Sequence, residues 1–138
     1  MKEKIKVIAF DADDTLWDCQ SWFDEVEHKC CELLSPWATA REVSEGLFAT
    51  ERKNLSLTGY GTKAFTLSLI ENAVRVSKEQ LTGDIVMRLI ELGQGLLKFP
   101  TTPLPEVEET LCTLAERRHY LHHYLGADDV LVLYEDVG

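Results

Sequence analysis

Residues 7–17 read Val7-Ile8-Ala9-Phe10-Asp11-Ala12-Asp13-Asp14-Thr15-Leu16-Trp17. In this stretch a short apolar run is followed abruptly by a cluster of acidic residues. A nearly unbroken apolar run is typical of a strand that is buried on both faces, as in the centre of a parallel sheet. Open α/β sheets bind their ligands at the carboxyl ends of such strands. The sequence therefore predicts a central parallel strand with a ligand site directly after it.

The three carboxylates of Asp11, Asp13 and Asp14 follow one another closely in the chain. Like charges repel, so ionising all three is costly unless a cation or hydrogen-bond donors compensate the charge. Mg²⁺ prefers oxygen ligands and usually binds together with a phosphate group, which makes it the expected partner. The alternative is a solvated acidic turn after an ordinary strand, since Asp also favours turns.

The run Asp11-Ala12-Asp13-Asp14-Thr15-Leu16 resembles the first motif of the haloacid dehalogenase superfamily, which is Asp-x-Asp-x-Thr followed by Leu or Val. The family usually has Gly where this chain has Asp14, although Asp is a familiar variant there. The resemblance implies that Asp11 is the nucleophile that accepts a phosphoryl group and that Asp13 is the general acid and base. It also implies that Asp11 and Asp13 hold Mg²⁺, through the carboxylate of the first and the backbone carbonyl of the second. Asp14 and Thr15 would complete the phosphate-binding loop, which the Thr15 hydroxyl helps to fix.

The composition limits the class of protein and its partners. A length of 138 residues suits one domain, or a small domain with an insertion. The net charge of −10 argues against nucleic acid or an anionic membrane as partner, because phosphate contacts need Lys and Arg. We expect neither a membrane span nor a signal peptide, since the apolar runs are short and the charged N-terminus leads straight into the apolar strand. The four cysteines have no metal-ligand spacing, and the adjacent Cys30 and Cys31 suit two thiols on a helix better than a disulfide, so we expect a protein of the reducing cytoplasm.

From residue 18 to about residue 100 the pattern changes to helical spacing. Apolar residues recur every three or four positions, a capping box at Thr39 and Glu42 starts one helix, and a glycine-containing loop interrupts the pattern at 57–62. These features predict an all-helical module of about four helices. Its expected inward residues are Trp22, Val26, Cys30, Leu33, Val43, Leu47, Phe48, Phe65, Leu69, Ala73, Val86, Leu89, Ile90, Gly93 and Leu97.

The position of this module matters for function. In the superfamily that the first motif resembles, a helical insertion directly after that motif is the cap, which closes over the active site and selects the substrate. Residues 54–55 and 59–68 also resemble the cap of one phosphatase-like subgroup. A glycine-flanked loop can supply substrate contacts, so Tyr60 and Lys63 are candidates. The alternative is a plain turn between helices with a solvated Lys63.

Residues 101–138 return from the helical module. Prolines predict a semi-rigid linker, followed by a helix from Pro105 to about residue 119 and a terminal strand over 130–136. The segment after this helix has no apolar strand ending in Thr or Ser, and it has no counterpart of the superfamily's later Lys or distal acidic motif. Asp136, at the end of the terminal strand, is the candidate for a further metal ligand. An ordinary terminal strand or an unrelated tail is the alternative.

The resemblance implies an α/β fold, with a haloacid dehalogenase-like Rossmannoid core, incomplete in this chain, and an all-helical cap. The expected domains are 1–17 for the first core strand and catalytic loop, 18–100 for the cap, and 101–138 for the return linker, core helix and terminal strand. The resemblance implies a Mg²⁺-dependent phosphatase that acts on a small phosphorylated metabolite through an aspartyl phosphate. The alternative is a catalytically deficient, truncated remnant that acts as an oligomeric or binding module. Because a half-built sheet leaves open edges, we expect a homo-oligomer.

Overall fold

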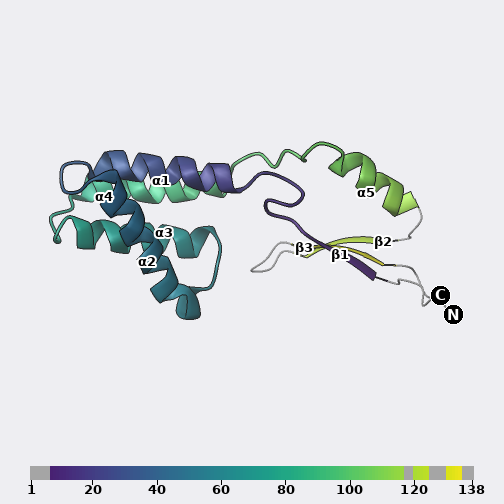
Figure 1. Ribbon diagram of the computed structural model, residues 1–138, viewed down its shortest axis with the longest axis horizontal. Helices are drawn as coiled ribbons and strands as arrows, with labels where there is room; N and C mark the ends of the chain where they lie inside the picture. The colour runs from purple at the N-terminus through teal and green to yellow at the C-terminus, as the bar shows by residue number, and fades with distance from the viewer. Residues whose placement is uncertain (1–6, 117–119, 125–129, 135–138) are drawn as a thin grey trace. The chain divides into compact units, whose positions relative to one another are not determined.

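The computed structural model describes residues 7–116, 120–124 and 130–134. These residues form five helices and three strands in two compact units (Figure 1). The first unit comprises residues 1–20 and 101–138, and the second comprises residues 21–100. Within the described ranges, no helix combines the length and the apolar composition that crossing a membrane requires.

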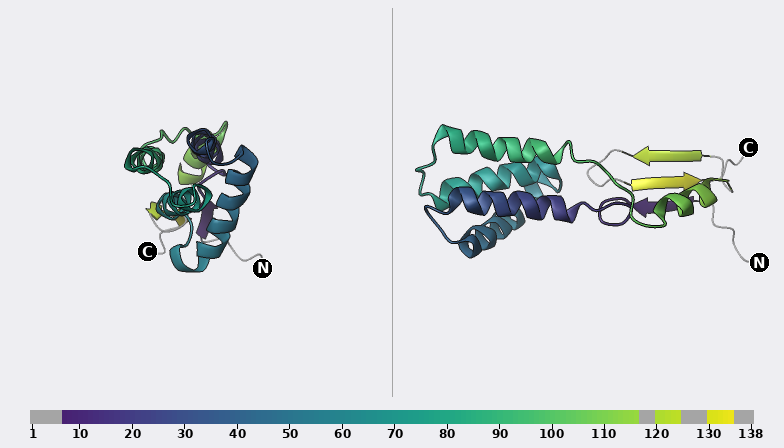
Figure 2. Two further views of the ribbon diagram at one scale, coloured as in Figure 1. Left: turned by 90° about the vertical axis from the view of Figure 1, so that its left-hand side faces the viewer. Right: turned by 90° about the horizontal axis from the view of Figure 1, so that it is seen from above.

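The first unit contains a three-stranded sheet of β1 (Val7–Asp11), β2 (Tyr120–Tyr124) and β3 (Val130–Tyr134). The strand order is β1-β3-β2, and both pairs are antiparallel. Figure 2 shows β3 between the other two strands. β1 ends at Asp11, which lies opposite Val130 in the β1–β3 pair. The predicted terminal strand is confirmed from residue 130 to residue 134, whereas its last two residues, Glu135 and Asp136, lie outside the described residues.

The prediction of a central parallel strand is wrong. β1 lies at an edge of the described sheet, and its described partner runs antiparallel to it. The other pair of the sheet, β2 and β3, is antiparallel as well. Only five residues separate these two strands in sequence, too few for the crossover that parallel strands need. Burial on both faces is wrong as well, since Ala9 is exposed and Ile8 and Phe10 are half-buried. The sequence pattern also misses β2, because His122 and His123 interrupt its apolar residues.

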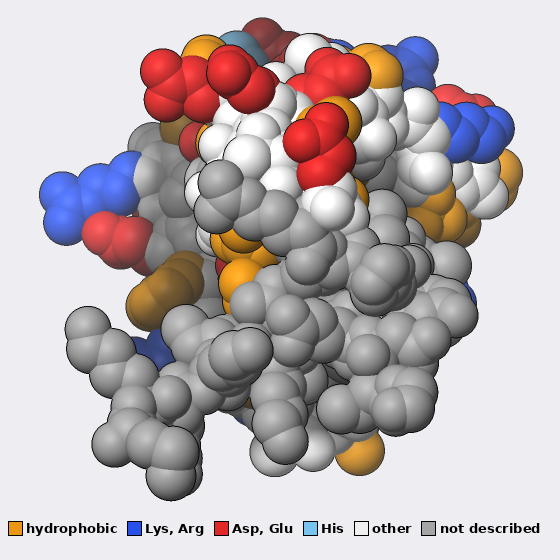
Figure 3. All heavy atoms as spheres, turned by 90° about the vertical axis from the view of Figure 1, so that its right-hand side faces the viewer, with side chains coloured by type: hydrophobic (Ala, Val, Ile, Leu, Met, Phe, Trp, Pro, Cys, Tyr) orange, Lys and Arg blue, Asp and Glu red, His pale blue; other side chains and the backbone are white. Residues whose placement is uncertain are grey.

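Helix α5 (Val107–Glu116) covers the loop that follows β1. Its residues Val107 and Leu111 pack against a small apolar cluster around the buried side chains of Ala12 and Leu16. The helix begins at Val107, two residues after the predicted start at Pro105, while its predicted end near residue 119 lies outside the described residues. Its first turn is acidic, which suits the partial positive charge of a helix N-terminus. Figure 3 shows Asp and Glu side chains gathered on the described part of one face, as the net charge of −10 leads one to expect.

The second unit consists of α1 (Gln20–Leu34), which begins one residue before the unit boundary, α2 (Ala40–Thr58), α3 (Thr62–Val76) and α4 (Gly83–Leu96). The apolar faces of the four helices meet in one core, as the helical spacing predicts (Figure 1). The buried residues of this core are Val26, Cys30, Cys31, Leu34, Val43, Leu47, Phe65, Leu69, Ala73, Leu89 and Leu96.

Local signals set the ends of these helices. The predicted capping box is confirmed, because Glu42 N donates to Thr39 Oγ1 at 3.3 Å and Thr39 N donates to Glu42 Oε2 at 2.9 Å. The hydrogen bond from the Thr39 backbone also lowers the pKa of the Glu42 carboxyl group. The predicted glycine loop separates α2 from α3, and both of its glycines have positive φ, 67° at Gly59 and 102° at Gly61. Such angles favour glycine over residues with a Cβ atom.

Two inward predictions are wrong. Phe48 is 63% exposed and lies beneath Arg52, whose guanidinium carbon is 5.8 Å from the ring centroid. Leu97 is 62% exposed, because α4 ends at Leu96 and the chain leaves the apolar stripe there.

Two aromatic rings are in contact where the chain enters and leaves the helical unit. Trp22, in the first turn of α1, stacks on Phe99, which follows α4, with ring centroids 5.5 Å apart and an interplanar angle of 21°. Offset stacking of this kind adds stability beyond the area that the rings bury. The two chain passages are therefore held together at one end of the unit.

Candidate functional site

The loop after β1 is a tight turn held by its own backbone. Thr15 N and Leu16 N donate to Ala12 O at 3.2 Å and 2.7 Å, and Asp14 N donates to Trp17 O at 2.8 Å. Ala12 and Leu16 are buried and anchor the turn in the apolar cluster beneath it. The remaining side chains of the turn are exposed, namely those of Asp11, Asp13, Asp14 and Thr15. The turn thus presents its polar groups together on the surface of the first unit.

Asp11 stands at the end of β1, and a neighbouring hydroxyl orients its side chain. Thr15 Oγ1 donates to Asp11 Oδ2 at 3.1 Å. The short turn brings the two residues together, since they are four positions apart in sequence. Asp11 therefore presents a solvent-accessible carboxylate whose orientation is restricted by the loop.

Asp13 is held by a different donor. The indole of Trp17 donates from Nε1 to Asp13 Oδ1 at 2.9 Å, and the backbones of the two residues form an isolated bridge. The sequence pattern did not single out Trp17 for this contact. Asp11 and Asp13 therefore each accept a hydrogen bond from a residue of the same turn.

Asp14 has a left-handed backbone, with φ of 58°. This conformation favours glycine, and Asp is among the few residues with a side chain that tolerate it. The geometry explains why the motif that this loop resembles usually has Gly at the position. The carboxylate of Asp14 is turned toward the start of α1, where Oδ1 accepts from Cys19 N and Gln20 N, each at 2.8 Å. Asp14 therefore caps the N-terminus of α1, although it lies six residues before the first residue of that helix.

Substitution of Asp14 separates its two roles. We expect Asp14→Ala to lower the free energy of unfolding by about 1 kcal/mol more than Asp14→Gly, because both lose the cap but only alanine is strained at positive φ. Asp14→Asn should be the mildest change, since asparagine tolerates this conformation and its amide oxygen can still accept both N–H groups. Urea denaturation of the three variants measures the order. Equal losses for alanine and glycine would contradict the left-handed assignment.

Cys19 lies beside the acidic residues of the loop and was also missed by the sequence pattern. Its side chain is buried. Burial, followed by the negative charges of Asp13, Asp14 and Asp18, raises the pKa of the Cys19 thiol to about 11. The thiol therefore stays protonated at neutral pH, and we assign it no nucleophilic role.

The loop presents three exposed carboxylates, and that of Asp14 is engaged with the start of α1. In the described part of the chain, no group of three or more His, Cys, Asp or Glu side chains could hold a metal ion. Asp136, the predicted further ligand, lies outside the described residues. Mg²⁺ is often bound through only one or two carboxylates and keeps several waters. At such an open site Asp11 would bind through its carboxylate, which ends the strand, and Asp13 through its backbone carbonyl, so the Asp13 carboxylate stays available for proton transfer.

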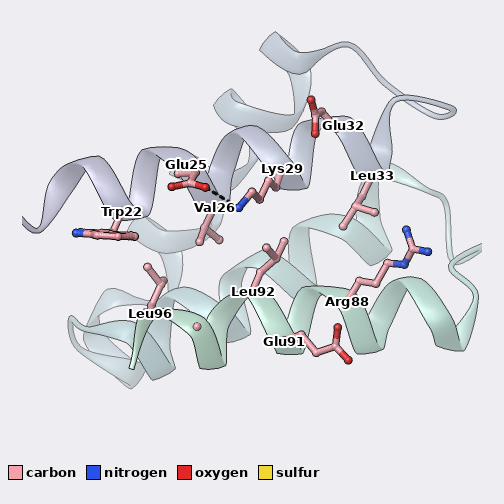
Figure 4. A pocket seen from close by; sticks show the side chains of 11 residues that line it. Trp22, Glu25, Val26, Lys29, Glu32, Leu33, Arg88, Glu91, Leu92 and Leu96 are labelled. Atoms are coloured by element: carbon pink, nitrogen blue, oxygen red, sulfur yellow. Dashed lines mark hydrogen bonds and ion pairs between the residues drawn. The ribbon is translucent and has the colours of Figure 1, made fainter. Parts of the chain in front are cut away.

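The helical unit has a groove of about 660 Å³ between α1 and α4 (Figure 4). Its floor is apolar, and an ion pair between Lys29 Nζ and Glu25 Oε1, 2.6 Å apart, lies on its rim. The predicted substrate contacts do not line this groove. Tyr60 is 70% exposed in the glycine loop, and Lys63 is exposed in the first turn of α3.

Comparison with solved structures finds chains that are similar to this one. The chain is similar to the crystal structure of a haloacid dehalogenase-like family hydrolase from Xanthomonas campestris, with 32% sequence identity and a TM-score of 0.71. The similarity covers 78% of this chain and 45% of that one, so the chain spans about half the length of the solved structure. No family model and no curated protein matches the chain. The similarity supports the superfamily that the first motif predicts, and the largely helical fold agrees with it.

Proposed function

We propose that this chain, as a haloacid dehalogenase-like hydrolase, is a phosphatase that removes the phosphoryl group from a small phosphorylated metabolite. One observation carries the proposal. Asp11 ends β1 with an exposed carboxylate that Thr15 orients, and a second carboxylate with its own hydrogen-bond donor, that of Asp13, follows two residues later. The similarity to a hydrolase supports the reaction class, while the phosphorylated substrate is inferred from the motif.

In the proposed reaction the Asp11 carboxylate attacks phosphorus, the bond to the leaving oxygen breaks, and Asp13 gives that oxygen its proton. Asp13 then takes a proton from a water molecule, which attacks the aspartyl phosphate and releases inorganic phosphate and free Asp11. Phosphoryl transfer depends mainly on positioning and on compensation of negative charge. Mg²⁺ bound at Asp11 and Asp13 would supply that compensation, which is needed here because the loop itself is acidic.

The remaining expectations complete the proposal. The helical unit would select the substrate, with Tyr60 and Lys63 as contacts, because the Lys63 ammonium group suits an anionic substrate and both side chains are exposed. The edge position of β1 favours self-association into a homo-oligomer. The predicted compartment is the cytoplasm.

The test is metal-dependent turnover of p-nitrophenyl phosphate by the full chain. We expect release of p-nitrophenol in Mg²⁺, loss of turnover in EDTA and its return when excess Mg²⁺ is added. Ca²⁺ is a suitable control, because it demands more ligands in a looser geometry and should support turnover poorly. Turnover that is unchanged in EDTA would rule out the metal-dependent mechanism.

A second candidate function is a binding module without turnover. The observation in its favour is that the described residues hold no metal-binding group of three side chains. Calorimetric titration separates the two candidates. Mg²⁺ binding and dimerisation without any phosphate release would favour the module, whereas binding coupled to turnover favours the phosphatase.

A further inference from the structure

We propose that Trp17 is a positioning residue, whose indole N–H holds the Asp13 carboxylate in the orientation that proton transfer requires. The inference rests on the proposed function for its consequence in catalysis, but the contact itself is a property of the folded chain. The distance of 2.9 Å from Nε1 to Oδ1 is the usual length of an N–H···O hydrogen bond.

The contact matters because the described residues do not bury Asp13. Its side chain is exposed, and an exposed carboxylate without a fixed donor samples several rotamers. General acid catalysis requires the proton to lie within hydrogen-bond reach of the leaving oxygen. A donor that selects one rotamer of Asp13 therefore acts directly on the step in which the leaving oxygen is protonated.

Trp17 is itself held from two directions. Its backbone carbonyl accepts from Asp14 N at 2.8 Å, and its backbone forms a bridge with Pro103 in the returning segment. The neighbouring Leu16 O accepts from Leu104 N at 2.8 Å, and the Trp17 side chain packs against the Ala12–Leu16 cluster. The indole is thus anchored by segments that are far apart in sequence, so its N–H has a defined position.

The chemistry of the side chain suits this task. The indole is a donor only, it carries no charge and it does not titrate. It can therefore hold a carboxylate without competing for the transferred proton. A Lys or Arg in the same place would hold the carboxylate too, but would add a charge at the general acid.

The contact is tested by NMR on protein labelled with ¹⁵N-tryptophan and ¹³C-aspartate. Trp17→Phe identifies the Trp17 indole signal by its loss. In Asp13→Asn, which leaves the ring and its packing intact, we expect that signal to move upfield because a neutral acceptor replaces a carboxylate. The indole signals of Trp22 and Trp37, in the helical unit, should stay in place. An indole signal of Trp17 that ignores Asp13→Asn would overturn the proposal.

Positioning is measured on Asp13 without any need for turnover. We expect the χ1 couplings of Asp13 to report a single rotamer in the unsubstituted chain and averaged rotamers in Trp17→Phe. Averaged couplings in both proteins would also overturn the proposal. If the chain proves inactive, the proposed function fails while these two measurements still decide the role of Trp17.

In the active protein, Trp17→Phe should lower kcat about 10- to 100-fold and change KM little, because the substrate still binds but the acid is misplaced. Trp37→Phe makes the same substitution at a half-buried position of the helical unit and should leave kcat unchanged. A variant Trp17→Phe with wild-type kcat would show that the hydrogen bond does not serve catalysis.

Discussion

Replacement of Asp11 by Asn should lower the turnover of p-nitrophenyl phosphate by about 10³-fold or more, since the loss of a nucleophile is among the largest effects that one substitution has on an enzyme. The amide is neutral and does not form the aspartyl phosphate. It can still accept the hydrogen bond from the Thr15 hydroxyl, so the turn should keep its shape. The loss is therefore chemical rather than structural. Steady-state kinetics in Mg²⁺, with the melting temperature recorded for each protein, measures both.

The control for Asp11→Asn is Asp24→Asn, which removes the same charge from an exposed position of α1. Acid quenching of a reaction with ³²P-labelled substrate adds a direct readout of the intermediate. Label should remain on the unsubstituted chain and on Asp24→Asn, and be absent from Asp11→Asn. Retention of label in Asp11→Asn would place the nucleophile elsewhere.

The second large effect concerns stability. Leu69→Ala should lower the free energy of unfolding of the helical unit by about 2–5 kcal/mol, because it removes a fully buried leucine from the core and leaves a cavity. Leu67→Ala is the matched control, since Leu67 lies in the same helix but is 57% exposed. Its effect should stay within about 0.5 kcal/mol.

Both leucine variants change helix propensity equally, so the difference between them isolates burial. Urea denaturation followed by far-ultraviolet circular dichroism gives the two free energies. Similar losses for the two would mean that Leu69 does not lie in a packed core.

The sequence predicts the helical unit well because its signals are local. A spacing of three to four residues places Phe65, Leu69 and Ala73 on one face of α3, and the structure buries all three. The capping box at Thr39 is likewise read from four consecutive residues. Phe48 misleads the prediction because it is next to the buried Leu47 in sequence, yet about 100° away from it around the helix.

The sheet is predicted less well because its partners are distant in sequence. The residues near β1 in sequence do not indicate that its neighbour is β3, or that the pair is antiparallel. The candidate site is likewise predicted only where its signals are local. The acidic residues are visible in the motif, whereas the contact from Trp17 to Asp13 depends on how the turn closes. The role of Asp14 had a readable signal, since the usual Gly of the motif already indicates positive φ at that position.

The stack of Trp22 on Phe99 has a topological consequence. Because Trp22 in the first turn of α1 contacts Phe99 after α4, the two ends of residues 21–100 lie close together. Ends that lie together are what allow one domain to be inserted into another without interrupting it. We therefore expect that a short linker between Gln20 and Thr101 can replace residues 21–100 without interrupting the first unit.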